Sequence, residues 1–234
     1  MVDLAAASDE LFTIPRWLKA LGGVFTLFIA AAIAFAVFEP IQVLPRIRLG
    51  PGYAMVGHDG STFTSETVRG SVTLYTFAPL ECGEQCDTID QTMRDVRSGV
   101  ASDVDLGDTD FRLVTISLEP VTETAALAAA AERAGADGNS WTWIGGDEAA
   151  LRTVVGAGFR RFYEPQDDGA IRFDPGFVLV DGAGIVRGEY RYQTLADDSD
   201  KLIRHINILA DELRYADGAT AVAYEAAHLF LCYP

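Results

Sequence analysis

The chain has 234 residues, the length of one domain of ordinary size with additional segments. Its 34 acidic residues outnumber its 18 Lys and Arg residues, which gives a formal charge of −16 at pH 7. A surface this acidic repels phosphate backbones, so we expect no nucleic-acid partner, whereas basic proteins or metal cations suit it. Apolar residues make up 49% of the chain, enough for a core together with a membrane segment.

Residues 20–38 form the first distinct element, a run of nineteen uncharged and mostly apolar residues. A helix of this length is about 28 Å long, close to the hydrocarbon thickness of a bilayer. The alternative is a cleaved signal peptide, but the run is longer than a usual signal core, and Asp9 and Glu10 make a poor basic leader. We therefore expect residues 1–19 to be cytoplasmic and residues 20–38 to be a single-pass anchor in the cell membrane. The large domain that follows is most simply exported to the extracytoplasmic side.

Residues 39–52 predict an extended stalk, because three prolines and two glycines interrupt regular structure. Two short strand signals follow, at Tyr53–Val56 and Thr62–Thr64. The turn residues His58-Asp59-Gly60 lie between them and predict a hairpin.

A cysteine pair lies where a predicted strand, Ser71–Phe77, is followed by a predicted helix from about Gly83 to Arg97. Cys82 and Cys86 are four residues apart, and residues with this spacing share one face of a helix. Both sulfurs can therefore point at one partner, either a soft metal ion or the disulfide of another protein. The alternative is a static disulfide, although a bridge that closes so short a loop removes little chain entropy.

Strands and helices continue to alternate along the rest of the chain. The predicted elements are strands at Phe111–Leu118 and Trp141–Ile144, helices at Pro120–Ala134 and Gly146–Val155, a hairpin of residues 177–181 and 185–192, an amphipathic helix over residues 197–213, and one more helix in the tail over residues 216–234. This order, with the cysteine pair at the first strand-to-helix junction of the core, predicts an α/β domain over residues 53–215. We expect a thioredoxin-like fold, in which a central mixed β-sheet is flanked by helices.

From about Tyr53 to Leu213 the sequence resembles the Sco/SenC family. Cys82 and Cys86 match the C-x-x-x-C motif of that family, and Val114–Pro120 looks like its strand that ends in an Asp-Pro-type turn. Later segments are similar in order and spacing, namely Ala131–Asp137, Trp141–Trp143, Gly145–Glu148 and Phe177–Gly184. The resemblance implies a membrane-anchored factor for cytochrome c oxidase assembly. Through Cys82 and Cys86 it would deliver Cu(I) to the dinuclear CuA centre or keep the cysteines of that centre reduced.

One position departs from the family pattern. Such proteins carry a histidine shortly before the Phe-Val-Leu-Val-Asp strand, where it completes a two-cysteine, one-histidine copper site, and here Phe173 takes its place. A phenyl ring cannot ligate a metal. Two thiolates hold Cu(I), whereas Cu(II) prefers nitrogen ligands, so we expect weak or absent Cu(II) binding. His228 and Cys232 offer a further pair at helical spacing, but this signal is weak, and the apolar residues between them favour docking on an apolar surface.

Acidic residues surround the cysteine pair, namely Glu81, Glu84, Asp87 and Asp90. A helix N-terminus favours a thiolate, whereas nearby carboxylates oppose it, and no basic residue lies close in the sequence. The lost histidine favours thiol–disulfide exchange and the acidic surroundings favour a cation, so both functions stay open. A third hypothesis is an accessory subunit of a membrane respiratory complex with a degenerate copper site. Its acidic face would then meet a basic electron carrier such as a cytochrome c.

Overall fold

The computed structural model describes residues 15–38, 41–121, 123–191, 198–215 and 219–230. The chain divides into two compact units, Met1–Ile41 and Gln42–Pro234. In the first unit, helix α1 (Arg16–Phe38) contains the helix predicted over residues 20–38. No helix in the described part of the chain combines the length and the apolar character needed to cross a membrane, so the predicted membrane-spanning anchor is not confirmed. Most of the predicted cytoplasmic segment, residues 1–14, lies outside the described residues.

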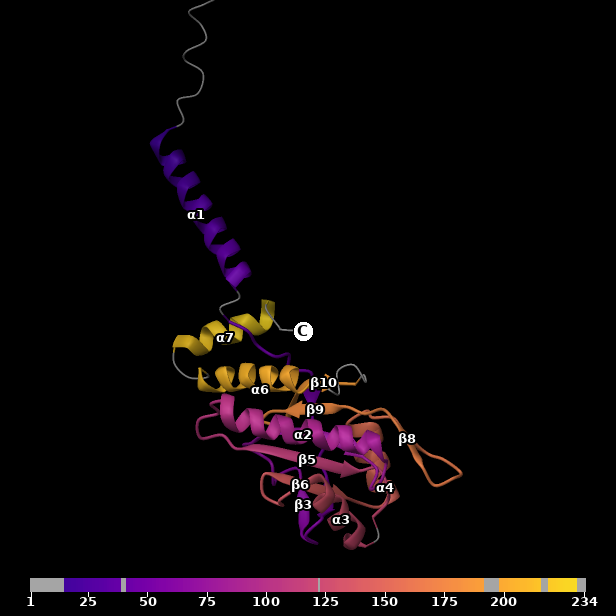
Figure 1. Ribbon diagram of the computed structural model, residues 1–234. Coiled ribbons are helices and arrows are strands. Elements are labelled where there is room, and N and C mark those ends of the chain that lie inside the picture. The colour runs from indigo at the N-terminus through magenta and orange to yellow at the C-terminus, as the bar shows by residue number, and fades with distance from the viewer. Residues whose placement is uncertain (1–14, 39–40, 122, 192–197, 216–218, 231–234) are drawn as a thin grey trace, which may run out of the picture. The chain divides into compact units, whose positions relative to one another are not determined.

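The second unit is built around a mixed sheet, shown in Figure 1, which has eight strands in the described part of the chain. Their order is β1-β10-β9-β4-β5-β6-β2-β3. The strands are β1 (Arg48–Leu49), β2 (Ala54–Gly57), β3 (Thr62–Thr64), β4 (Val72–Ala78), β5 (Phe111–Ser117), β6 (Trp141–Gly145), β9 (Phe177–Val180) and β10 (Ile185–Tyr190). Strands β4, β5 and β6 run parallel, while β9 lies antiparallel beside β4. The predicted α/β domain with a mixed central sheet is confirmed.

The helices described in this unit are α2 (Glu84–Asp103), α3 (Thr124–Ala134), α4 (Glu148–Leu151) with its π-helical continuation η1 (Arg152–Gly158), α6 (Ser199–Arg214) and α7 (Ala219–Phe230). Of these helices, α2 and α3 pack against the sheet. In α2 the buried apolar residues Ile89, Met93, Val96 and Val100 recur at helical spacing, and the helix packs against β4, β5 and α6. All seven residues of β4 are buried, so the strand that leads to the cysteine pair lies in the middle of the core.

Residues 42–52 differ from the extended stalk predicted for residues 39–52. The side chains of Val43 and Leu44 are fully buried, and β1 pairs with β10 through Arg48 and Val186. Burial removes these apolar side chains from water, which favours the packed arrangement over a free stalk. The segment therefore belongs to the compact unit.

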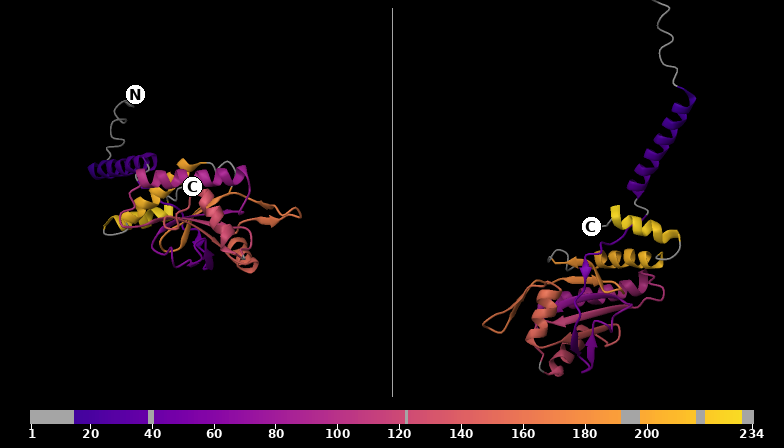
Figure 2. Two further views of the ribbon diagram at one scale, coloured as in Figure 1. Left: turned by 60° about the horizontal axis from the view of Figure 1, so that its bottom comes forward. Right: turned by 180° about the vertical axis from the view of Figure 1, so that it is seen from behind.

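The remaining elements are a hairpin that was not predicted from the sequence and a tail helix that was. A hairpin of β7 (Tyr163–Pro165) and β8 (Ile171–Phe173) stands where no regular structure was predicted, and Figures 1 and 2 show it projecting from the body of the domain. The predicted tail helix is present as α7. It packs against α6, with the rings of Tyr215 and Tyr224 stacked at a centroid distance of 5.6 Å.

Candidate functional site: a disulfide at the start of helix α2

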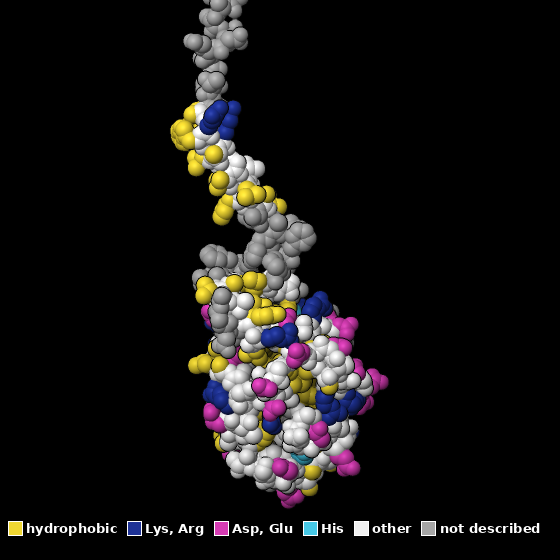
Figure 3. All heavy atoms as spheres, turned by 90° about the vertical axis from the view of Figure 1, so that its left-hand side faces the viewer, with side chains coloured by type: hydrophobic (Ala, Val, Ile, Leu, Met, Phe, Trp, Pro, Cys, Tyr) yellow, Lys and Arg dark blue, Asp and Glu magenta, His cyan; other side chains and the backbone are white. Residues whose placement is uncertain are grey.

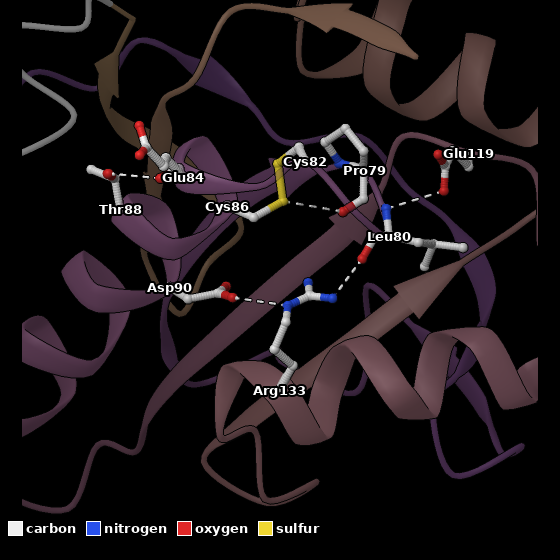
Figure 4. The surroundings of a disulfide bond; sticks show 9 residues. All are labelled: Pro79, Leu80, Cys82, Glu84, Cys86, Thr88, Asp90, Glu119 and Arg133. Carbon is white, nitrogen blue, oxygen red and sulfur yellow. Dashed lines mark hydrogen bonds and ion pairs between the residues drawn. A yellow bond between two sulfur atoms is a disulfide. The ribbon is translucent and has the colours of Figure 1, made fainter. Parts of the chain in front are cut away.

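Cys82 and Cys86 form a disulfide at the junction between β4 and α2, with their Cα atoms 5.2 Å apart (Figure 4). Strand β4 ends at Ala78, and a short loop carries the chain to Cys82. Gly83 then caps α2 with a φ of 57°, a left-handed conformation that glycine adopts without a steric penalty. This turn allows Cys86, in the first turn of the helix, to reach back to Cys82.

The two sulfurs differ in their access to solvent. Cys82 is half-buried, whereas Cys86 is 2% exposed and belongs to the hydrophobic core. The Sγ atom of Cys86 lies 3.7 Å from the carbonyl oxygen of Pro79, on the buried side of the loop. Of the two sulfurs, Cys82 is therefore the one that solvent reaches.

The loop before Cys82 is held from two sides at Leu80 (Figure 4). Its backbone N–H donates to Glu119 Oε2 at 3.1 Å, just beyond the end of β5. Its carbonyl oxygen accepts from the Arg133 guanidinium of α3 at 2.7 Å. Two different elements thus fix the position of the disulfide relative to the sheet.

Charges of both signs lie around the disulfide. Glu81, Glu84 and Asp87 are exposed, as expected for a solvated rim. Asp90 is different because only 2% of it is exposed, and burial raises the pKa of its carboxyl to about 6, against the smaller opposing effect of Arg133. The Nε atom of Arg133 lies 3.8 Å from Asp90 Oδ2.

Arg133 and Glu119 are the site residues that sequence reasoning missed. Arg133 lies 51 positions after Cys82 in number but reaches the site through the packing of α3, and its guanidinium also lies 6.0 Å from the centroid of the Trp143 ring. For Glu119, the sequence offered one signal, the family-like turn at the end of β5. That signal located the residue but predicted no contact for its side chain.

Of the two additional metal ligands considered from the sequence, His228 lies among the described residues, and there it forms no metal centre with the cysteines. His228 Nε2 lies 2.9 Å from Glu212 Oε1, and Cys232 is outside the described residues. Phe173, at the position of the family histidine, is 7% exposed and belongs to the apolar core. Across the described ranges, no group of three or more His, Cys, Asp or Glu side chains is arranged to hold a metal ion. The roles of Cys82 and Cys86 as copper ligands or as a redox pair remain predictions.

Comparison with known families shows to which family the chain belongs. The protein-family model described as SCO1/SenC matches residues 42–210, most of the second unit. The chain belongs to the SCO1/SenC family. The match begins before β1 and so includes the segment that was predicted as a stalk. None of the curated proteins matches the chain.

Solved structures of Sco proteins share the thioredoxin-like fold with this chain. A SCO1/SenC family lipoprotein from Bacillus anthracis aligns with a TM-score of 0.61 and 18% identity over 70% of this chain and 95% of its own. BsSco is a member of the Sco family of cytochrome c oxidase assembly proteins in which a disulfide switch was identified. It aligns with a TM-score of 0.59 and 18% identity over 72% of this chain and 97% of its own. Arabidopsis thaliana ScoI with copper bound aligns with a TM-score of 0.58 and 15% identity over 68% of this chain and 98% of its own. At these identities the likeness establishes the fold.

Proposed function

We propose that this Sco-family chain carries out thiol–disulfide exchange through Cys82 and Cys86 during assembly of cytochrome c oxidase, with the CuA-carrying subunit as its partner. The observation that carries the proposal is the disulfide itself, which joins a half-buried Cys82 to a buried Cys86 at the start of a helix. A helix N-terminus favours the thiolate form of a cysteine, which is the nucleophile in exchange. The description of the related BsSco as containing a disulfide switch supports the same chemistry.

The exchange runs in two balanced steps from the reduced chain. The Cys82 thiolate attacks a disulfide of the partner, so that a mixed disulfide forms and one partner thiolate leaves. Cys86 then loses its proton and attacks the Cys82 sulfur, which releases the second partner thiolate. The partner gains two electrons and, once its thiolates are protonated, two protons. The chain returns to the Cys82–Cys86 disulfide found in this structure.

Cu(I) is the second candidate, as cargo of the same pair. A reduced Cys82 and Cys86 offer two thiolates, a donor set that suits a soft ion of low coordination number, and the exposed carboxylates of Glu81, Glu84 and Asp87 favour a cation. Phe173 supplies no third ligand, so this donor set does not suit Cu(II). Copper bound to Arabidopsis ScoI supports the proposal of Cu(I) as cargo.

Membrane association is part of the proposed function. Figure 3 shows apolar side chains along α1, and those of Trp17, Leu21, Phe25 and Phe28 are between 62% and 72% exposed. An exposed apolar surface of this kind marks a contact with a membrane or another protein. That a similar structure belongs to a lipoprotein, from Bacillus anthracis, supports a contact with the membrane. The disulfide is consistent with an oxidising, extracytoplasmic compartment for residues 42–234.

Two measurements on the purified full chain test the proposal. The first equilibrates the chain with a disulfide-bonded peptide from a CuA-carrying subunit. Reduced wild type should yield peptide dithiol together with the Cys82–Cys86 disulfide, and the variants Cys82→Ser and Cys86→Ser should not. The second is anaerobic Cu(I) titration against a chromophoric chelator, with Cys232→Ser as the matched control for loss of a thiol. One-to-one binding that requires both Cys82 and Cys86 would favour copper delivery.

Two results would contradict these proposals. A stable one-to-one Cu(II) complex with a sulfur-to-copper charge-transfer band would contradict the expected preference for Cu(I). A chain that neither exchanges with the peptide nor binds Cu(I), but co-purifies with a respiratory complex in mild detergent, would favour an accessory subunit. In that case Cys82→Ser would leave oxidase assembly unchanged.

A further inference from the structure

Asp90 is a buried carboxyl on the helix that carries the disulfide. It is 2% exposed, and its Oδ1 atom has no hydrogen-bond partner among the described residues. Its other oxygen, Oδ2, lies 3.8 Å from Arg133 Nε, an ion pair without hydrogen-bond geometry. Burying a polar group without full compensation is costly, so the position of Asp90 needs a reason beyond packing.

The place of Asp90 relative to the cysteines suggests that reason. Asp90 follows Cys86 by four residues, and both side chains belong to the buried face of α2. Residues at this spacing have Cβ atoms about 5–6 Å apart, a separation at which one water molecule can carry a proton between the two side chains. Figure 4 shows the carboxyl on the turn after Cys86, extending toward Arg133.

We propose that Asp90 accepts the proton of the Cys86 thiol when that sulfur attacks, and returns a proton when Cys86 leaves as a thiolate. The inference rests on the proposed thiol–disulfide function and assigns a residue to its slow proton step. It does not depend on the identity of the partner protein.

The proton step concerns Cys86 because that sulfur is buried. A thiol in apolar surroundings holds its proton more tightly than one in water, so it attacks slowly without a base. In the resolving step, the Cys86 proton passes to the Asp90 carboxylate and the resulting thiolate attacks the Cys82 sulfur. The Cys82–partner bond breaks, and the partner leaves as a thiolate. Asp90 then loses its proton to water, so that atoms and charges balance.

The charges around Asp90 poise it for this task. Arg133 from α3 and Arg94 from α2 favour its charged form, whereas Asp87 from α2 and burial oppose it. Burial is the largest effect, and the pKa of Asp90 lies at about 6. A general base works best when its pKa is near the pH of the solution, so this value suits a base in neutral solution. At pH 7 most Asp90 side chains are therefore carboxylates that can receive a proton.

The test isolates the resolving step with a small disulfide reagent. Full chains carrying Cys232→Ser are reduced and mixed with one equivalent of 5,5′-dithiobis(2-nitrobenzoate), which labels the half-buried Cys82 and releases a first equivalent of thionitrobenzoate. The second equivalent appears when Cys86 attacks Cys82. Its rate is followed by absorbance from pH 5 to pH 10 for wild type, Asp90→Asn and Asp87→Asn.

We expect Asp90→Asn to slow the second release at least about tenfold at pH 7, within the range of general base catalysis. The difference should vanish toward pH 10, where hydroxide removes the thiol proton unaided. Asp87→Asn removes an exposed carboxylate next to Cys86 and should keep the pH profile of wild type. A rate for Asp90→Asn equal to wild type, or slower by the same factor at every pH, would overturn the inference.

A second measurement needs no variant, so it holds even where Asp90→Asn fails to fold. Selective ¹³C labelling of Asp carboxyls gives the titration midpoint of Asp90 in the reduced and the oxidised chain. A shared proton predicts different midpoints in the two states, and identical midpoints would contradict it. A wild type that releases a single equivalent would contradict the proposed function itself, whereas two equivalents with unchanged kinetics in Asp90→Asn contradict the role of Asp90 alone.

Discussion

Asp90 makes the stability of the folded chain depend on pH in a direction opposite to that of most carboxyls. Burial raises its pKa from 3.8 to about 6, so the folded state binds a proton more tightly than the unfolded state does. This contribution to stability is full below pH 4 and is lost as the pH rises through 6. Because one pKa unit corresponds to about 1.4 kcal/mol, the loss is at most about 3 kcal/mol.

Asp90→Asn should therefore gain free energy of unfolding relative to wild type as the pH rises from 4 to 8. Urea unfolding of the disulfide form across this range measures the difference. The partly exposed Arg133 loses its ion-pair partner in this variant at little cost. The exposed neighbour Asp87 provides the control, because Asp87→Asn should show a difference from wild type that stays flat over the same range. A flat difference for Asp90→Asn as well would show that the buried carboxyl does not titrate as described.

Some residues of the candidate site could be predicted from the sequence and others could not. Cys82 and Cys86 could be identified because their spacing and their position after a strand are local properties. The interaction with Arg133 could not, because it depends on how α3 packs across β6 and α2. The unequal burial of the two sulfurs likewise follows from the packing of α2 against the sheet. In the proposed exchange, this inequality distinguishes the attacked sulfur from the leaving one.

At the scale of elements, a buried charge cluster ties the N-terminal part of the second unit to β10 and α6. The side chain of Arg187 is 2% exposed and lies 3.1 Å from Asp181 and 2.5 Å from Glu212. It also donates to the backbone carbonyls of Leu44 and Pro45, at 2.7 Å and 3.2 Å. One guanidinium therefore joins a segment predicted as a stalk to the core.

Arg187→Met should lower the free energy of unfolding by about 3–5 kcal/mol, because it removes the buried cation that Asp181 and Glu212 share. Arg214→Met is the matched control. Arg214 pairs with Asp105 and Asp211, but its side chain is 41% exposed, so this loss should stay below about 1 kcal/mol. Urea unfolding of both variants gives the comparison. Equal losses would mean that the cluster around Arg187 contributes no more than a surface ion pair.

Elements with a clear local sequence signal were predicted well. Strands β4 and β5 carry β-branched and apolar runs, and α3 ends at Gly135, which adopts the left-handed conformation of a helix C-cap. The packing of residues 43–49 was missed because it depends on a pairing with β10, more than 130 positions later. The hairpin β7–β8 was missed because polar turn residues outweigh its short strands.

The whole molecule combines an acidic domain with an apolar α1, and this combination predicts how the full chain partitions. Replacing Leu21, Phe25 and Phe28 together by Ser should reduce flotation with phospholipid vesicles by at least about a hundredfold, since each buried apolar side chain contributes about 1.5–3 kcal/mol. The control replaces three exposed apolar residues of the second unit by Ser, namely Leu49, Phe162 and Val222. The control should float like wild type. Equal flotation of the α1 variant and wild type would show that the apolar side chains of α1 serve another contact, and the compartment of the cysteine pair would then need a different argument.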